Sequence, residues 1–131
     1  RKPFPNIPIV VTKSKTAEMV KYFINCFLAT KVIFANQMFE ICESTGIDYD
    51  KVCEYALYDN RIGKSHLSVP GPDGDLGFGG HCFPKDLAAM ISFADNIEAN
   101  NLFLKSVDDY NQSLRSNFDW KKMKGRAVSE D

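Results

Sequence analysis

The chain has 131 residues, a formal net charge of -1 and a sequence pI of about 6.1. This length fits one domain, with or without tails, that buries a real core. The nearly balanced charge argues against nucleic acid as a partner. Four cysteines without a CxxC pair, and only two histidines, argue against a metal site or a disulfide scaffold. They fit a reducing compartment such as the cytoplasm.

The N-terminal segment, residues 1–13, is predicted to be a lead-in to the main domain. It holds three prolines and has no signal-peptide core, and no apolar run anywhere in the chain is long enough to span a bilayer. Residues 10–12 form either a short edge strand or part of a disordered arm. Because the chain begins with Arg1 rather than methionine, we expect a fragment or a processed product.

The pattern of residues 16–45 predicts one long helix. Ser14 or Thr16 can cap its start and Gly46 can stop it, with no proline or glycine between. Apolar residues recur at three- and four-residue spacing in two rows, Ala17, Val20, Ile24, Phe27, Phe34, Met38 and Ile41, and Leu28, Ala35 and Cys42. Because they cover more than half of the circumference, the helix is either central to its domain or packed against a second subunit. We predict a homodimer through this helix.

Three shorter helices are predicted to follow, at residues 49–59, 84–94 and 102–114. Asp48 can cap the first of them. The inward positions of this helix are Val52, Cys53, Ala56 and Leu57. The apolar residues of the second helix are Leu87, Met90, Ile91 and Phe93. One side of the third helix carries Leu102, Phe103, Val107, Tyr110 and Leu114. Residues 66–80 read as a long loop rich in Gly, Pro and Asp, and residues 116–131 as a charged tail. The predicted fold class is all-α, with a short extended N-terminus.

A loop at residues 77–86 concentrates reactive side chains between two predicted helices. Its glycines allow positive φ and a close approach to a ligand, and Pro84 suits the first turn of a helix. Cys82 would then lie at a helix N-terminus, where peptide dipoles favour a thiolate. Lys85 adds positive charge, and Asp86 can accept a proton. This pattern is typical of a nucleophilic cysteine, and the alternative is a free buried cysteine.

Lys21 and Asn25 are four residues apart on the long helix and therefore project from one face. Cys82 and Asp86 have the same spacing, so the two pairs could converge on one substrate atom. The alternative is that Lys21 is a solvated lysine and Asn25 a neutral residue, since most helical lysines are exposed.

Three segments together resemble the UDP-glucose/GDP-mannose dehydrogenase family, and the UDP-glucose 6-dehydrogenases most closely. They are residues 17–29 around Lys21 and Asn25, the Asn-Arg-Ile-Gly segment at 60–63, and the Gly-Gly-His-Cys-Phe-Pro-Lys-Asp segment at 79–86. The resemblance covers about residues 9–115. It implies that residues 14–115 are the helical central domain, similar to the C-terminal domain of 6-phosphogluconate dehydrogenase, with the dimer core on its long helix. Residues 1–13 would lead in from an NAD-binding domain, and residues 116–131 would link to a nucleotide-sugar domain.

The resemblance implies oxidation of the sugar C6, from UDP-glucose to UDP-glucuronate, as in polysaccharide biosynthesis. Cys82 would add to the C6 aldehyde to give a thiohemiacetal, and a second hydride transfer to NAD would give a thioester that water hydrolyses. Lys21 would stabilise the oxyanion, Asn25 would hold the same oxygen or the water, and Asp86 would orient water or act as a base.

Further residues acquire binding roles from the resemblance. Arg61 would reach the nucleotide diphosphate across the dimer, Phe78 and Gly79 would bind the sugar, and Lys85 would approach NAD. Arg61 could instead balance a helix dipole, and Lys85 could be a solvated residue. The loop at 66–76 is longer than is common in the family, so its residues are assigned no role and the exact sugar stays open.

Two other functions are compatible with the sequence. One is a non-catalytic helical dimerisation module that retains the cysteine loop. The other, less favoured, is a thiol hydrolase or transferase, which would need a base that neither His66 nor His81 is securely placed to supply. Residues 1–131 contain no Rossmann glycine fingerprint, so we expect the isolated chain to be inactive.

Overall fold

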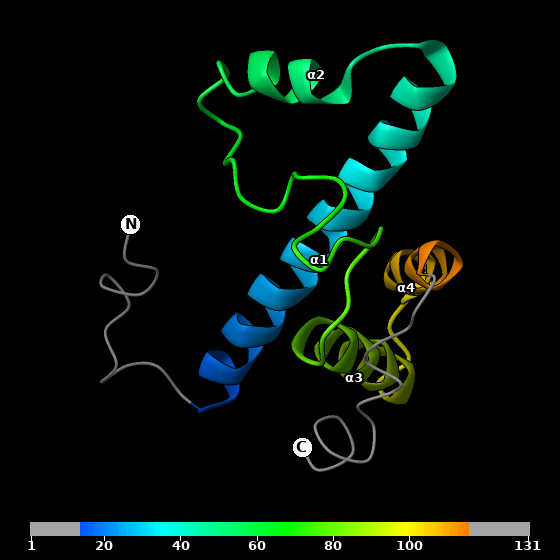
Figure 1. Cartoon of the computed structure of the whole chain (residues 1–131). Helices are drawn as coiled ribbons and strands as arrows, with labels where there is room; N and C mark the ends of the chain where they lie inside the picture. Colours follow the sequence, from blue (N-terminus) through cyan, green and yellow to red (C-terminus); the bar gives the residue numbers. More distant parts are fainter. Residues whose placement is uncertain (1–13, 116–131) are drawn as a thin grey trace.

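A computed structural model describes residues 14–115, and within this range all regular secondary structure is helical. The helices are α1 (Ser14–Thr45), α2 (Tyr49–Ala56), α3 (Cys82–Asn96) and α4 (Leu102–Leu114). The long diagonal helix in Figure 1 is α1, with α3 and α4 on one side of it and α2 beside its C-terminal end. The predicted all-α class is confirmed. The predicted strand at 10–12 and the predicted segments 1–13 and 116–131 lie outside the described residues.

The long helix α1 is continuous over 32 residues. At a rise of about 1.5 Å per residue it is roughly 48 Å long. Gly46 ends it with φ of +74°, and the amide of Ile47 donates to the carbonyl of Cys42 at 2.9 Å. This left-handed C-terminal turn closes the helix where the sequence predicted the stop.

Two clusters of buried side chains lie along α1. The first joins α1 to α3 and α4 and contains Cys26, Ala29, Ile33, Phe78, Leu87 and Val107. The second joins the C-terminal half of α1 to α2 and the following loop and contains Ala35, Cys42, Tyr49 and Val69. Phe78 belongs to the loop before α3, so the first cluster fixes part of this loop in the core.

The second helix, α2, begins as predicted and ends earlier. Asp48 caps it, because its Oδ1 accepts from the amides of Asp50 at 3.0 Å and Lys51 at 3.4 Å. The helix ends at Ala56 instead of residue 59, and residues 57–60 turn away with the amide of Asp59 donating to the carbonyl of Ala56 at 3.0 Å. The prediction that Ala56 faces inward is wrong, because no other element covers this last turn and Ala56 is exposed.

The third helix, α3, begins at Cys82, two residues before the predicted start. The carbonyl of His81 accepts from the amide of Lys85 at 3.1 Å, which closes the first turn. Pro84 then occupies the third helical position, where its missing N–H costs no hydrogen bond. Cys82 is therefore the first helical residue and not the residue just before the helix.

The fourth helix, α4, has the predicted bounds. Val107 is buried on its inner side. Leu102 and Phe103, which were predicted on the same side of the helix, are exposed. They lie in the first turn of α4, beyond the reach of the core between α1 and α3. In residues 14–115 no helix is both long and apolar enough to cross a bilayer.

Candidate active site

The predicted faces of α1 and α3 meet at Asn25 and Asp86. The side-chain amide of Asn25 donates to Oδ2 of Asp86 at 2.6 Å, across 61 residues of sequence. Asp86 is 2% exposed, so this hydrogen bond compensates part of the cost of burying a carboxylate. The structure therefore brings together one member of each predicted pair.

Cys82 lies one helical turn before Asp86 and is exposed, unlike the other three cysteines, of which Cys26 and Cys42 are buried and Cys53 is partly buried. Its position at the N-terminus of α3 places the thiol near the positive end of the helix dipole. An accessible sulfur at this end of a helix is suited to nucleophilic attack.

Cys26 contacts the same acid and has a different character. Its Sγ lies 3.9 Å from the main-chain oxygen of Asp86. Burial, and to a smaller extent the charge of Asp86, raise the pKa of Cys26 to about 11. This thiol stays protonated near neutral pH and serves the packing of α1 against α3, as predicted for a buried free cysteine.

Lys21 lies one turn before Asn25 on α1 and is exposed. Its ammonium is 5.4 Å from the centroid of the Tyr22 ring. The structure thus places Lys21 on the same helix as Asn25 without burying it or joining it to Asp86. An oxyanion role would require the substrate to lie over this part of α1.

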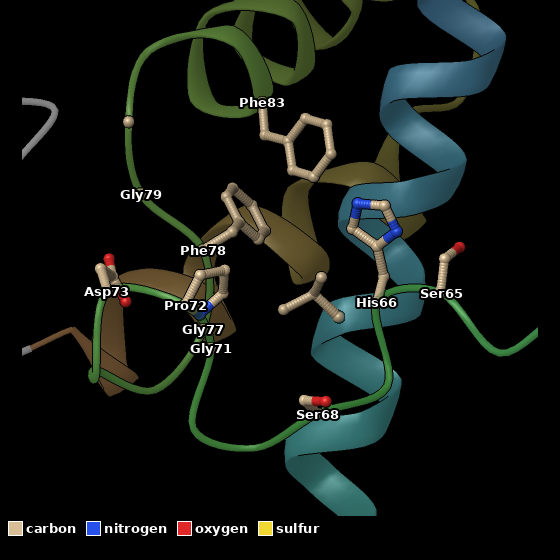
Figure 2. A pocket seen from close by; sticks show the side chains of 12 residues that line it. Ser65, His66, Ser68, Gly71, Pro72, Asp73, Gly77, Phe78, Gly79 and Phe83 are labelled. Atoms are coloured by element: carbon tan, nitrogen blue, oxygen red, sulfur yellow. The ribbon is translucent and has the colours of Figure 1, made fainter.

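A pocket of about 520 Å³ opens beside the loop that leads into α3. It is lined by Val32, Ser65, His66, Ser68, Gly71, Pro72, Asp73, Gly77, Phe78, Gly79, Gly80 and Phe83. Figure 2 shows the rings of His66, Phe78 and Phe83 gathered at this hollow. The ring centroid of Phe83 is 6.0 Å from that of Phe78 and 5.7 Å from that of His66.

The pocket contains two of the predicted binding residues, Phe78 and Gly79. Cys82, Lys21 and Asn25 are not among its lining residues, although Gly80 and Phe83 on either side of Cys82 are. The volume lies within the range of small-molecule sites. The pocket and the thiol are therefore neighbours along one loop.

His66 is a pocket residue to which the sequence gave no role. It adopts φ of +65°, which is uncommon for a residue with a side chain. Burial, and then the nearby Lys31 cation, lower its pKa. The ring is consequently neutral near pH 7 and offers the pocket one hydrogen-bond donor and one acceptor.

Arg61 lies outside the pocket and is strongly exposed. Its Nε and Nη2 donate to the two carboxylate oxygens of Asp59 at 2.9 and 2.6 Å. This pairing lowers the pKa of Asp59 and raises that of Arg61. The neighbouring turn is tied to α1, because Lys31 donates to the carbonyl of Gly63 at 2.6 Å. The structure gives Arg61 a fixed position and no contact with the predicted catalytic residues.

Lys85 lies in the first turn of α3 and is partly buried. Within residues 14–115 there is no strand and hence no strand-turn-helix dinucleotide site. No group of three or more His, Cys, Asp or Glu in the same residues could hold a metal ion.

Comparison with known proteins identifies the domain. Residues 15–113 match the model of the UDP-glucose/GDP-mannose dehydrogenase family, central domain. The chain belongs to this family. The resemblance on residues 17–29, 60–63 and 79–86 is thereby confirmed. The match begins at the first turn of α1 and ends at the last turn of α4, so it includes the pocket, the cysteine loop and the Asn25–Asp86 contact.

Curated relatives of this domain include proteins of Bacillus subtilis and Haloferax volcanii. The chain is 42% identical over 115 residues to the UDP-glucose 6-dehydrogenase YwqF of Bacillus subtilis, covering 88% of the chain and 25% of that protein. It is 36% identical over 128 residues to TuaD, a UDP-glucose 6-dehydrogenase of the same organism, covering 93% and 27%. It is 45% identical over 89 residues to the UDP-glucose 6-dehydrogenase AglM of Haloferax volcanii, covering 68% and 20%. The chain thus spans about a quarter of the length of the first two.

Sequence reasoning missed three residues of this family domain that shape its pocket. Asn36, Asn111 and Arg115 are buried polar residues whose partners lie in the loop before α3. The signal available in the sequence was a polar residue among apolar ones, since Asn111 follows the buried Val107 by one helical turn.

Proposed function

We propose that this chain is the central domain of an NAD-dependent nucleotide-sugar dehydrogenase that oxidises C6 of UDP-glucose to the carboxylate of UDP-glucuronate. The observation that carries the proposal is the hydrogen bond between Asn25 and Asp86. It joins the Lys21 and Asn25 face of α1 to the helix that begins with the exposed Cys82. The identity to UDP-glucose 6-dehydrogenases at about 40% supports this substrate.

Cys82 supplies the nucleophile in the second half of the reaction. After the C6 alcohol has become an aldehyde, the thiolate adds to C6, a C–S bond forms and the carbonyl oxygen becomes an oxyanion. Loss of hydride from this adduct gives a thioester. Water then attacks the acyl carbon, the C–S bond breaks, and the thiol and the carboxylate product result. When bound, NAD would accept the hydride that leaves C6 in each oxidation.

Asn25, Lys21 and Asp86 act around the C6 oxygen. Asn25 uses one amide hydrogen for Asp86, which leaves its second hydrogen and its carbonyl oxygen for the substrate oxygen or for water. Lys21 stabilises the oxyanion when the sugar lies over its part of α1. Asp86, held by Asn25, orients the hydrolytic water and accepts its proton.

The pocket beside the loop is proposed to hold the sugar and the adjoining part of the nucleotide. Its aromatic rings can cover the apolar face of a sugar ring, and the hydroxyls of Ser65 and Ser68 with the neutral His66 can bind sugar hydroxyls. Phe78 and Gly79, which belong to the cysteine loop, form part of the pocket wall. Lys85 at the start of α3 would hold the anionic cofactor, most of whose contacts would come from residues outside this chain.

Arg61 is proposed to bind the nucleotide diphosphate of the second subunit. Its guanidinium already forms a two-point contact with a carboxylate, Asp59, which is the geometry that also suits a phosphate. Because the pair is exposed, exchanging the carboxylate for a diphosphate costs little.

A homodimer through α1 is supported by a stripe of exposed apolar side chains, Met19, Phe23, Phe27, Phe34 and Ile41. At roughly 100° per residue, these five positions fall within an arc of about 80° on the helix. Such a stripe at four- and seven-residue spacing is suited to packing against a second helix.

We expect the wild-type chain to sediment as a dimer at micromolar concentration. Changing both Phe27→Glu and Phe34→Glu should raise the dimer dissociation constant by about 10³-fold or more, because two buried rings are lost. Tyr58→Glu is the matched control, since Tyr58 is also exposed but lies after α2, and it should leave the dimer intact. A wild-type monomer at this concentration would contradict the proposed interface.

The proposed function is tested by NADH formation from UDP-glucose. The full-length gene product that contains this chain should reduce NAD, and the isolated 131-residue chain should not, since its described residues lack a dinucleotide-binding unit. Clear turnover by the isolated chain would refute the need for a further domain. A folded, dimeric full-length product that oxidises no nucleotide sugar would refute the enzyme and favour the dimerisation module.

A further inference from the structure

A pair of hydrogen bonds holds the backbone of Phe78 to α4. Oδ1 of Asn111 accepts from the Phe78 amide at 2.7 Å, and Nδ2 of Asn111 donates to the Phe78 carbonyl at 3.1 Å. Asn111 is 1% exposed, so both polar ends of its side chain are used inside the protein. This two-point contact fixes both position and orientation of the peptide groups that form one wall of the pocket.

The preceding residue, Gly77, is held from the other side by α1. Its amide donates to Oδ1 of Asn36 at 3.1 Å, while Nδ2 of Asn36 donates to the carbonyl of Val32 at 2.8 Å. Gly77 has φ of +72°, and a Cβ added there would overlap Oδ1 of Asn111. The helices α1 and α4, which are far apart in sequence, therefore hold the adjacent residues Gly77 and Phe78 by side-chain hydrogen bonds. The close approach of Asn111 leaves room only for glycine at position 77.

Arg115 extends this anchor to the outer part of the loop. Its side chain is fully buried. Nη1 donates to the carbonyl of Leu76 at 3.1 Å, Nη2 donates to Oδ2 of Asp73 at 2.6 Å, and Nε lies 3.8 Å from Oδ2 of Asp75. The planar guanidinium thus connects three points of the loop to the end of α4.

The loop segment that these bonds hold, residues 73–78, contributes to the pocket wall and precedes the proposed nucleophile in the chain. Asp73, Gly77 and Phe78 line the pocket, and four residues after Phe78 α3 begins with Cys82. Only three residues, Gly79, Gly80 and His81, lie between Phe78 and Cys82. The position of the pocket wall relative to the thiol therefore depends on where the anchor holds Phe78.

We propose that Arg115, with Asn111 and Asn36, is a positioning residue that sets the sugar-binding wall relative to Cys82. The proposal rests on the proposed function. Burying a guanidinium is rarely the most stable choice, since apolar side chains of similar volume often give equal or greater stability. What Arg115 adds is a fixed geometry for the loop at Asp73 and Leu76.

Two conservative variants of the full-length gene product test this inference. Arg115→Lys keeps the positive charge and loses the planar fork, and Asp73→Asn removes the charge on the partly exposed partner. Each should raise KM for UDP-glucose about 10-fold with a smaller change in kcat, because ground-state and transition-state binding are weakened together. The double variant should be no worse than Arg115→Lys alone, because the contact between Arg115 and Asp73 is already lost in that variant. Amide exchange at Phe78 should accelerate about 10-fold in all three.

Tyr110→Phe is the matched control. It removes an exposed hydrogen bond, at 2.7 Å, from the same helix to Glu40, which does not belong to the loop. It should lower the melting temperature by a few degrees and leave KM and Phe78 exchange unchanged. If folded Arg115→Lys and Asp73→Asn proteins keep the wild-type KM and Phe78 exchange, the positioning role is wrong. If the wild type oxidises no nucleotide sugar, the proposed function fails, and Phe78 exchange still decides whether Arg115 anchors the loop.

Discussion

Replacing Cys82 with serine is expected to lower the rate of UDP-glucuronate formation by the full-length gene product at least about 10³-fold. A serine hydroxyl is a weak nucleophile without an adjacent base, and its ester is a poorer acyl donor than a thioester. Because Cys82 is exposed at the start of α3, the change should leave the free energy of unfolding nearly unaltered. The measurement is kcat for acid formation, followed by chromatography.

Cys53→Ser is the control for this prediction. Cys53 is only partly buried and lies on α2, in the second cluster of the core. It should keep the wild-type kcat. A Cys82→Ser protein that forms the acid at the wild-type rate would exclude Cys82 as the nucleophile.

The second large effect is expected for Gly77→Ala. Alanine at φ of +72° costs about 1–2 kcal/mol. In addition, its Cβ would displace Asn111, and the two hydrogen bonds to Phe78 would be lost at about 1 kcal/mol each. We expect a loss of about 3–4 kcal/mol in the free energy of unfolding, measured by urea denaturation of this chain.

Gly74→Ala is the control that separates the cost of backbone strain from the cost of losing the Asn111 hydrogen bonds. Gly74 has φ of +81° and nothing within 4 Å of an added Cβ, so this variant should lose only the conformational part, about 1–2 kcal/mol. Equal destabilisation by the two variants would show that the Asn111 contact contributes nothing to the stability of the loop.

The helices were predictable because their signals are local. Gly46 and Asp48 mark the end of α1 and the start of α2, and three- and four-residue spacing marks α1 and α4. The end of α2 was misplaced because the sequence after Ala56 holds no strong stop signal, and only tertiary packing decides how many turns are stabilised. The start of α3 was set two residues late because a proline was assumed to open the helix, whereas Pro84 is tolerated throughout the first turn.

The candidate site was predictable where residues share a helical face. The spacing of Lys21 with Asn25 and of Cys82 with Asp86 predicted two facing pairs, and the structure joins one residue of each. Whether the two pairs meet depends on how α3 packs on α1. Only the family resemblance indicated that they would.

The pocket loop could not be predicted in the same way. Its path depends on hydrogen bonds between side chains and backbone, such as those of Asn36 and Asn111, and the backbone donors and acceptors in these bonds leave no trace in the sequence. Arg115 lies after the last turn of α4, where its sequence context is typical of a solvated residue. Only the structure places its guanidinium inside the protein, against Asp73 and Leu76.

In the proposed mechanism, C6 of the sugar is bound to the sulfur of Cys82 during the second oxidation. The most direct test of this step is the number of NADH molecules formed per UDP-glucose consumed in a single turnover of the full-length gene product. We expect two for the wild type and at most one for Cys82→Ser, because the first oxidation needs no covalent bond to sulfur. Two NADH per UDP-glucose in the serine variant, at the wild-type rate, would contradict this mechanism.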